Sequence, residues 1–233
     1  MKLILENWRK YITEKRNDIH IFFDMDGVLV DFAGKVAEEI NKTLHKNPDE
    51  LYPDSKSKRK GLKRLQDVFK EEGRTTPVTA DELEALTAKK DAGEERTIME
   101  KRISSYLFSL ISNNPQIWID MEMLPGAEEM VNAATQIGNV YILTSPVDDA
   151  SENAKKQWAS NHFPSIQSDK VVVTSEKGAH LQNMGIIEKG ERALLVDDRI
   201  KYIRQFEEAG GETIHHSAET VSNTMELLRN FVR

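Results

Sequence analysis

Two aspartates spaced two residues apart stand just after the first short apolar run of the chain. Asp24 and Asp26 follow the run 21–23 and precede Gly27. The run is too short for a helix and is typical of a strand buried on both faces. Two carboxylates this close repel each other unless a cation or a shared proton intervenes, and Mg²⁺ prefers such oxygen ligands. The pattern predicts a magnesium site at the carboxyl edge of a parallel sheet, where open α/β folds bind ligands.

The same two acids suit the chemistry of phosphate esters. Asp24 could attack a phosphorus centre and form an aspartyl-phosphate, while Asp26 protonates the leaving oxygen and later deprotonates water. Gly27 allows the tight turn and the close backbone approach that a phosphate requires. A calcium-binding loop is the main alternative, but it needs further acids and a terminal Glu, whereas residues 28–30 are apolar.

Three later apolar runs, each short enough to be a strand, also lead into polar residues. Because the carboxyl ends of parallel strands meet at one edge of a sheet, we expect these residues to converge with Asp24 around one cation. Each motif is weak alone, and their joint occurrence at strand ends is the signal. In chain order, the polar stretches are 144–145, 174–177 and 197–198.

These stretches, in this order, resemble the motifs of the haloacid dehalogenase superfamily of phosphohydrolases. The resemblance implies that Asp24 is the nucleophile and a metal ligand. It implies that Asp26 is the acid/base and binds the metal through its carbonyl. Asp197 and Asp198 would complete the metal site, with the direct ligand of the two left open.

The resemblance also implies a set of phosphate ligands. Thr144 and Ser145 would hold phosphate oxygens, and one Lys between the second and third motifs would neutralise the nucleophile and the phosphate. We favour Lys177, because it follows a strand and opens a predicted helix. Lys170 is the alternative, but it precedes the same strand and would lie at the opposite edge of the sheet.

Several stretches are more similar to one branch of the superfamily, the 5′(3′)-deoxyribonucleotidases. This similarity implies that Phe32 and Trp118 line the pocket for the base and the sugar. Ile117 departs from the branch, which has an aromatic residue there, so the base preference stays open. The similar stretches are 24–32, 114–126, 144–146 and 155–159.

The distribution of apolar runs predicts an α/β fold with an inserted domain. Residues 33–120 lack the strand pattern and are charged and helix-rich, so we expect a helical cap domain there. A cap over the carboxyl edge of the sheet would exclude water and select the substrate. We expect residues 1–32 and 121–233 to form the haloacid dehalogenase-like core, a Rossmann-like parallel sheet in a three-layer α/β/α arrangement.

Within the core, short apolar runs alternate with amphipathic stretches. Residues 2–16 carry apolar side chains at helical spacing and predict an amphipathic helix. Trp158 is expected to be a core residue of a later helix. We predict strands near 139–143, 170–174, 193–197 and 212–215, and helices near 127–137, 149–161, 178–185, 199–209 and 217–232.

Composition narrows the class of protein. The chain has 233 residues, enough for a core domain with an insertion, and it has no cysteine. Without cysteine there is no disulfide or thiolate metal site, which fits a reducing compartment, and we expect a cytoplasmic protein. No apolar run reaches the length of about 18 residues that a membrane span needs, so no membrane partner is expected.

One basic run contrasts with the net charge of −7, which disfavours nucleic-acid binding by charge alone. A run of basic residues is usually a solvated helix face. The more specific interpretation is that it lines a groove for a nucleic-acid backbone. The run lies within the predicted cap and comprises Lys56, Lys58, Arg59, Lys60, Lys63 and Arg64.

The motifs together predict a Mg²⁺-dependent phosphatase of the 5′-nucleotidase type. The expected substrate is a small-molecule phosphate ester, a nucleoside monophosphate and in particular a deoxynucleotide. A sugar phosphate or a nucleic-acid 3′-phosphate end is the rival substrate on the same fold. A non-catalytic binding protein is the remaining alternative, which the complete set of acids, hydroxyls and lysine disfavours. The oligomeric state is left open.

Overall fold

The computed structural model describes residues 18–217 and 220–231, so the helix predicted over 2–16 lies outside the described residues. The chain divides into two compact units. The sheet unit comprises Met1–Val30, Met123–Pro146 and Lys155–Arg233, and the helical unit comprises Asp31–Glu122 and Val147–Ala154.

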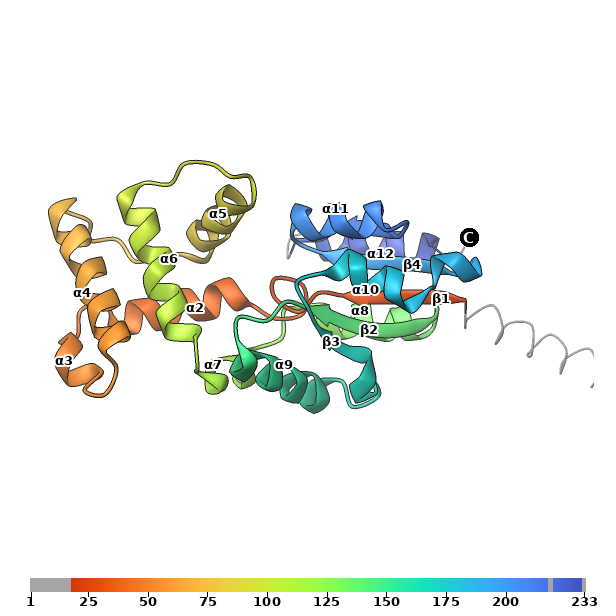
Figure 1. Cartoon of the computed structure of the whole chain (residues 1–233), viewed down its shortest axis with the longest axis horizontal. Helices are drawn as coiled ribbons and strands as arrows, with labels where there is room; N and C mark the ends of the chain where they lie inside the picture. The colour runs from red at the N-terminus through yellow and green to blue at the C-terminus, as the bar shows by residue number, and fades with distance from the viewer. Residues whose placement is uncertain (1–17, 218–219, 232–233) are drawn as a thin grey trace, which may run out of the picture. The chain divides into compact units, whose positions relative to one another are not determined.

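The sheet unit is built on five parallel strands in the order β3-β2-β1-β4-β5 (Figure 1). The apolar residues 21–23 of the central strand β1 are fully buried. Phe23 lies opposite Ile142 of β2 and Val196 of β4. The predicted α/β class with a Rossmann-like parallel sheet is confirmed. The strands are β1 Ile19–Phe23, β2 Asn139–Thr144, β3 Val171–Val173, β4 Arg192–Asp197 and β5 Glu212–His215.

Helices cover both faces of this sheet (Figure 1). On one face, Phe22 and Leu195 pack in a buried cluster with Leu181 of α10 and Phe206 of α11. On the other face, α8 and α12 pack against each other. The helices of this unit are α8 Ala127–Thr135, α10 Lys177–Met184, α11 Ile200–Glu208 and α12 Val221–Asn230, with α9 Asp149–His162 crossing the unit boundary and short 3₁₀ turns at Ser168–Lys170 and Ile187–Lys189.

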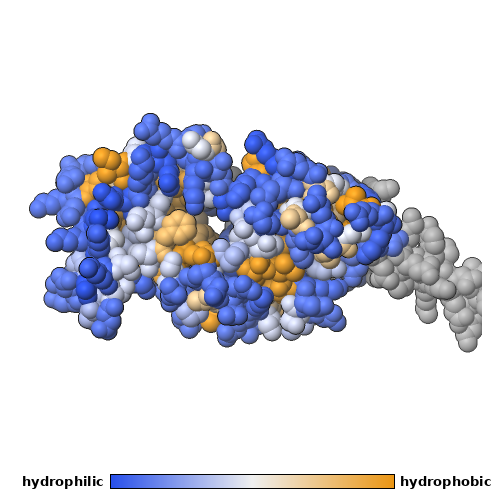
Figure 2. Space-filling view, in the orientation of Figure 1, coloured by the Kyte–Doolittle hydropathy of each residue, from blue (hydrophilic) through white to orange (hydrophobic). Residues whose placement is uncertain are grey.

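The described part of the helical unit contains helices and connecting loops, as its charged sequence predicted. Local caps set several helix starts, and the clearest is the reciprocal pair in which Thr97 and Glu100 bond each other's backbone N–H groups. The surface of the helical unit is largely hydrophilic on the face shown in Figure 2. The helices are α2 Phe32–Thr43, α3 Pro48–Leu51, α4 Lys56–Glu71, α5 Ala80–Asp91, α6 Ile98–Ile111 and α7 Pro115–Ile119.

No helix in the described residues has the length and apolarity that crossing a membrane requires.

The role of residues 33–120 as a cap stays a prediction.

Candidate active site

The loop after β1 is shaped by a glycine. The backbone N–H of Asp24 donates to the carbonyl of Val196 (2.9 Å), which fixes the start of the loop against β4. Gly27 has a φ of +80°, and a Cβ placed on it would lie 2.6 Å from Oδ2 of Asp198. Only glycine meets both demands without strain, so this residue lets the loop after β1 lie directly against the end of β4.

Three segments bring opposite charges together at the carboxyl edge of the sheet. The Nζ of Lys177 lies 2.6 Å from Oδ1 of Asp24 and 2.6 Å from Oδ2 of Asp197. Lys177 and Asp197 are fully buried, and Asp24 is almost so. Burial alone would lower the pKa of Lys177, but the charges of Asp24 and Asp197 outweigh it and raise that pKa above its usual value. Lys177 is therefore a permanent cation at the predicted nucleophile.

Three acids gather around this one ammonium. One ligand atom from each of Asp24, Asp197 and Asp198 lies within 4.8 Å of the other two. Burial, and next to it the charge of Asp24, raise the pKa of Asp198 well above its usual value. Burial likewise raises the pKa of Asp197 to about 6. Among the described residues, the buried Oδ1 of Asp198 has no hydrogen-bond partner. An excess of buried carboxylate oxygens with one orphan acceptor fits a hard divalent cation.

A second buried lysine serves the other predicted catalytic acid. The Nζ of Lys155 donates to Oδ2 of Asp26 (2.6 Å), to Oγ1 of Thr144 (3.1 Å) and to the backbone carbonyl of Ser145 (2.7 Å). Lys155 itself is fully buried. It therefore ties the predicted acid/base to both predicted phosphate ligands.

The sequence prediction missed Lys155 as a site residue. The signal that would have found it is helical spacing, because Ser151, Ala154, Trp158 and Ala159 are all buried on the same face of α9. A lysine within such a face is unusual unless its ammonium has partners. The same packing confirms Trp158 as a core residue.

The carboxyl of Asp26 lies inside the site although 26% of its side chain is exposed. Burial raises the pKa of Asp26, and the charge of Asp24 adds to this, while Lys155 opposes it. The other oxygen of this carboxyl, Oδ1, is buried without a hydrogen-bond partner in the described part of the chain. Asp26 thus has the raised proton affinity that a general acid needs.

Phe32 and Trp118, the predicted pocket residues, belong to the helical unit. Their rings stack with centroids 5.3 Å apart and an interplanar angle of 18°. Trp118 is fully buried, and the neighbouring Ile117 is almost so. The two aromatic residues therefore lie together, and their contact with a substrate stays a prediction.

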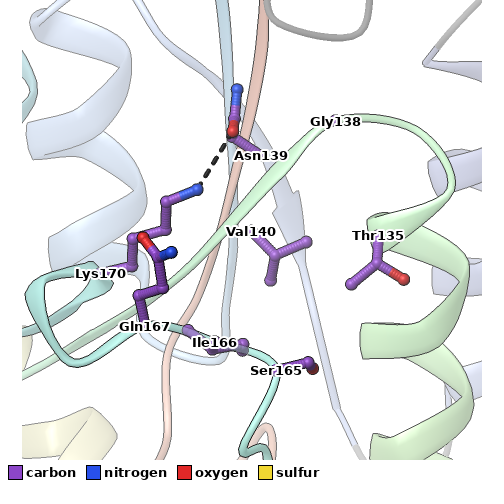
Figure 3. A pocket seen from close by; sticks show the side chains of 8 residues that line it. All are labelled: Thr135, Gly138, Asn139, Val140, Ser165, Ile166, Gln167 and Lys170. Atoms are coloured by element: carbon purple, nitrogen blue, oxygen red, sulfur yellow. Dashed lines mark hydrogen bonds between the residues drawn. The ribbon is translucent and has the colours of Figure 1, made fainter. Parts of the chain in front are cut away.

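Lys170, the rejected alternative to Lys177, lies at the other end of the strands. Its Nζ donates to Oδ1 of Asn139 (3.1 Å), at the start of β2. A hollow of about 230 Å³ adjoins this pair, and Figure 3 shows its lining. Since Asp24 follows the carboxyl end of β1, parallel to β2, Lys170 is placed away from the acids.

A family model for haloacid dehalogenase-like hydrolases matches residues 20–210 of this chain. The chain belongs to the haloacid dehalogenase-like hydrolases. The matched range includes all four strand-end motifs described above, from the acids after β1 to the acids after β4. Membership in this hydrolase family therefore accounts for the sheet and for the convergence of charged groups at its carboxyl edge.

Solved structures of other haloacid dehalogenase-like proteins are similar to this hydrolase over most of its length. A haloacid dehalogenase-like family protein from Streptococcus pneumoniae is 14% identical, covers 92% of this chain and 99% of its own, and has a TM-score of 0.46. A HAD family enzyme from Bacteroides thetaiotaomicron, in complex with magnesium and inorganic phosphate, is 14% identical, with coverages of 85% and 94% and a TM-score of 0.41. CbbY from Rhodobacter sphaeroides, in complex with phosphate, is 13% identical, with coverages of 83% and 84% and a TM-score of 0.39. No curated protein matches the chain at a significant level.

Proposed function

We propose that this hydrolase is a Mg²⁺-dependent phosphatase in which Asp24 is the nucleophile. The observation that supports this most directly is the pair of 2.6 Å contacts from Lys177 to Asp24 and Asp197 in a buried site. A buried carboxylate held by a permanent cation is fixed in orientation, which nucleophilic attack on phosphorus requires.

The metal would be held by side-chain oxygens of Asp24, Asp197 and Asp198, together with the backbone carbonyl of Asp26. When bound, Mg²⁺ supplies positive charge that offsets the negative charge of the phosphate oxygens. The orphan Oδ1 of Asp198 is the acceptor in this set that most needs such a partner.

The proposed reaction has two steps. In the first, a carboxylate oxygen of Asp24 forms a bond to phosphorus, the bond to the ester oxygen breaks, and Asp26 gives its proton to the departing oxygen. In the second, a water attacks the phosphorus of the aspartyl-phosphate and Asp26 takes a proton from that water. Phosphate leaves, and Asp24 returns as a carboxylate.

The two lysines would divide the work of positioning. Lys177 holds the carboxylate of Asp24, and its charge offsets that of the incoming phosphate. Lys155 donates to Asp26 at 2.6 Å and to Thr144 at 3.1 Å, so one ammonium would position both the acid/base and a phosphate ligand. The hydroxyl groups of Thr144 and Ser145 would donate hydrogen bonds to phosphate oxygens.

We propose a nucleoside monophosphate, and in particular a deoxynucleotide, as the substrate, with residues 33–120 acting as the cap that selects it. The similarity of residues 24–32 and 114–126 to the 5′(3′)-deoxyribonucleotidases supports this choice. Phe32, which is partly exposed and stacks on the buried ring of Trp118, supplies an aromatic ring of the kind that a nucleobase contacts.

A panel of phosphate esters assayed with Mg²⁺ tests the proposal. Deoxynucleoside and ribonucleoside monophosphates, sugar phosphates and a 3′-phosphorylated oligonucleotide would be compared by kcat/KM, with Asp24→Asn as the control for contaminating activity. We expect the highest kcat/KM for a mononucleotide and no turnover by Asp24→Asn. A sugar phosphate or the oligonucleotide as the best substrate would contradict the substrate choice, and full activity of Asp24→Asn would contradict the chemistry.

A further inference from the structure

Helix α4 of the helical unit concentrates positive charge in an otherwise acidic chain. It carries seven basic and two acidic side chains over Lys56–Glu71, whereas the chain as a whole has a net charge of −7. The helix is capped by Ser55, whose hydroxyl accepts from the backbone N–H of Lys58. At physiological ionic strength charges act over a Debye length of about 8 Å, so the cations of α4 act together and distant acids are screened.

The packing of α4 leaves five of its seven basic residues on one outward face. Leu62, Leu65, Val68 and Phe69 are buried, and α4 packs against α6. The exposed basic side chains fall on the opposite side of the helix, where Figure 2 is largely hydrophilic over α4. We name them the α4 basic face: Lys56, Lys60, Lys63, Arg64 and Lys70.

These five cations lack the acidic partners that lysines elsewhere in the unit have. On α2, Lys42 lies 2.8 Å from Glu38, and on α5, Lys89 lies 2.6 Å from Glu100. None of the five forms a salt bridge or a side-chain hydrogen bond with another described residue. The basic residues outside the face differ, because Lys58 lies over the ring of Tyr52 and Arg59 donates to its carbonyl. The α4 basic face is therefore available to an external anion.

We propose that the α4 basic face binds the phosphate backbone of single-stranded nucleic acid. At a rise of about 1.5 Å per residue, Lys56 and Lys70 are about 21 Å apart along the helix. The Cβ atoms of residues three or four apart on a helix, such as Lys56, Lys60 and Lys63, lie about 5–6 Å apart. A flexible strand that carries one phosphate per nucleotide can follow this straight row, whereas the strands of a duplex curve away from it.

Other anionic partners fit the face less well. A helix that binds a membrane surface inserts apolar side chains, and the apolar side chains of α4 are already buried against α6. An acidic protein would have to present its carboxylates in a matching straight row. The two acids of α4, Asp67 and Glu71, are also exposed, but both lie beyond the first three lysines, which leaves Lys56, Lys60 and Lys63 as the strongest part of the face.

The strength of the effect follows from the number of phosphates contacted. For about four contacts on a single strand, the slope of log K against log[salt] is about −3. Raising the salt from about 50 to 200 mM should then weaken binding about 50-fold.

Fluorescence anisotropy with the full chain tests this surface. The probes are single-stranded DNA and RNA of about 20 nucleotides, with hydroxyl groups at both ends so that no phosphate monoester is offered. We expect both probes to bind with this salt dependence. The triple variant Lys56→Glu, Lys60→Glu, Lys63→Glu should weaken binding more than tenfold at low salt.

A matched triple variant separates local from overall charge. Lys101→Glu, Arg204→Glu and Arg229→Glu change the net charge equally at exposed positions outside α4, and should weaken binding less than twofold. Equal weakening by both triples would overturn the proposal, as would tighter binding to anionic vesicles or polyglutamate than to either oligonucleotide. Glutamine replacements at the same α4 positions serve if the reversed charges prevent folding. A failed test leaves the phosphatase proposal untouched, because no probe is a substrate.

Discussion

Removing Lys155 should disable the chemistry while leaving the fold in place. We choose Lys155→Met, because methionine fills nearly the same buried volume without donating hydrogen bonds. The change removes the donor of three contacts, at 2.6 Å to Asp26, 3.1 Å to Thr144 and 2.7 Å to the carbonyl of Ser145. Asp26 and Thr144 would then lose their common anchor.

The expected size of the effect follows from the contact to Asp26. A hydrogen bond to a charged group contributes about 1.5–3 kcal/mol, and each 1.36 kcal/mol is tenfold in rate, so its loss from a catalytic acid should lower kcat about 10- to 150-fold. The free energy of unfolding should fall by about 1–3 kcal/mol, because buried polar atoms are left unpaired.

The assay compares kcat for a mononucleotide with urea unfolding of the same preparations. Lys156→Met is the matched control, since it removes the neighbouring lysine, which is exposed, from the same helix. Lys155→Arg, which keeps the charge, should recover part of kcat. A Lys155→Met enzyme with at least one third of the wild-type kcat would refute the reasoning, and so would an equal loss in Lys156→Met.

Three further predictions follow from the loop, the metal site and a buried histidine. Gly27→Ala should lower the free energy of unfolding by more than the roughly 1–2 kcal/mol that left-handed backbone strain costs, because its Cβ would also clash with Asp198. Gly73 has a φ of +63° with open space around it, so Gly73→Ala should show the strain alone when both variants are compared by urea unfolding. Asp198→Asn should weaken Mg²⁺ binding at least tenfold by calorimetry while unfolding as the wild type does, and chelation should abolish turnover. Burial, aided by the charge of His215, lowers the pKa of His216 to about 4, so its contribution to stability is complete above pH 6.5 and is lost as the pH falls toward 4. Between about pH 7 and 5, the wild type should lose about 2 kcal/mol more stability than His216→Gln.

Each of these predictions has an outcome that contradicts it. Equal stability losses for Gly27→Ala and Gly73→Ala would remove the argument for the close approach to Asp198. Unchanged magnesium affinity in Asp198→Asn would mean that its orphan oxygen is not a ligand. If the free energies of unfolding of the wild type and His216→Gln fell equally with pH, the protonation of His216 would not be coupled to unfolding.

The sheet and its strand-end motifs were predictable from local patterns. Short apolar runs such as 21–23 cannot bury themselves as helices, and parallel strands place their carboxyl ends together, so the approach of Asp24, Lys177 and Asp197 followed from order alone. The position of Lys170 followed from the same rule, because a residue before a strand lies at the other edge.

The role of Lys155 was less accessible, because it depends on tertiary packing. Helical spacing places it on the face of Ala154 and Trp158, but the partner of its ammonium, Asp26, is known only from the structure. The pairing of Phe32 with Trp118 was also beyond local patterns, since 86 positions of helical sequence separate two residues that stack. Sequence spacing carries no information on which aromatic rings meet across such a distance.

The phosphorylation of Asp24 is the most direct test of the proposed chemistry. Enzyme mixed with Mg²⁺ and a mononucleotide would be quenched in acid during turnover, digested and analysed by mass spectrometry. We predict that one phosphoryl group is found on the peptide that contains Asp24, at that side chain, and that it is absent from Asp24→Asn. Turnover with no phosphorylated Asp24, or a phosphoryl group on another residue, would contradict the account.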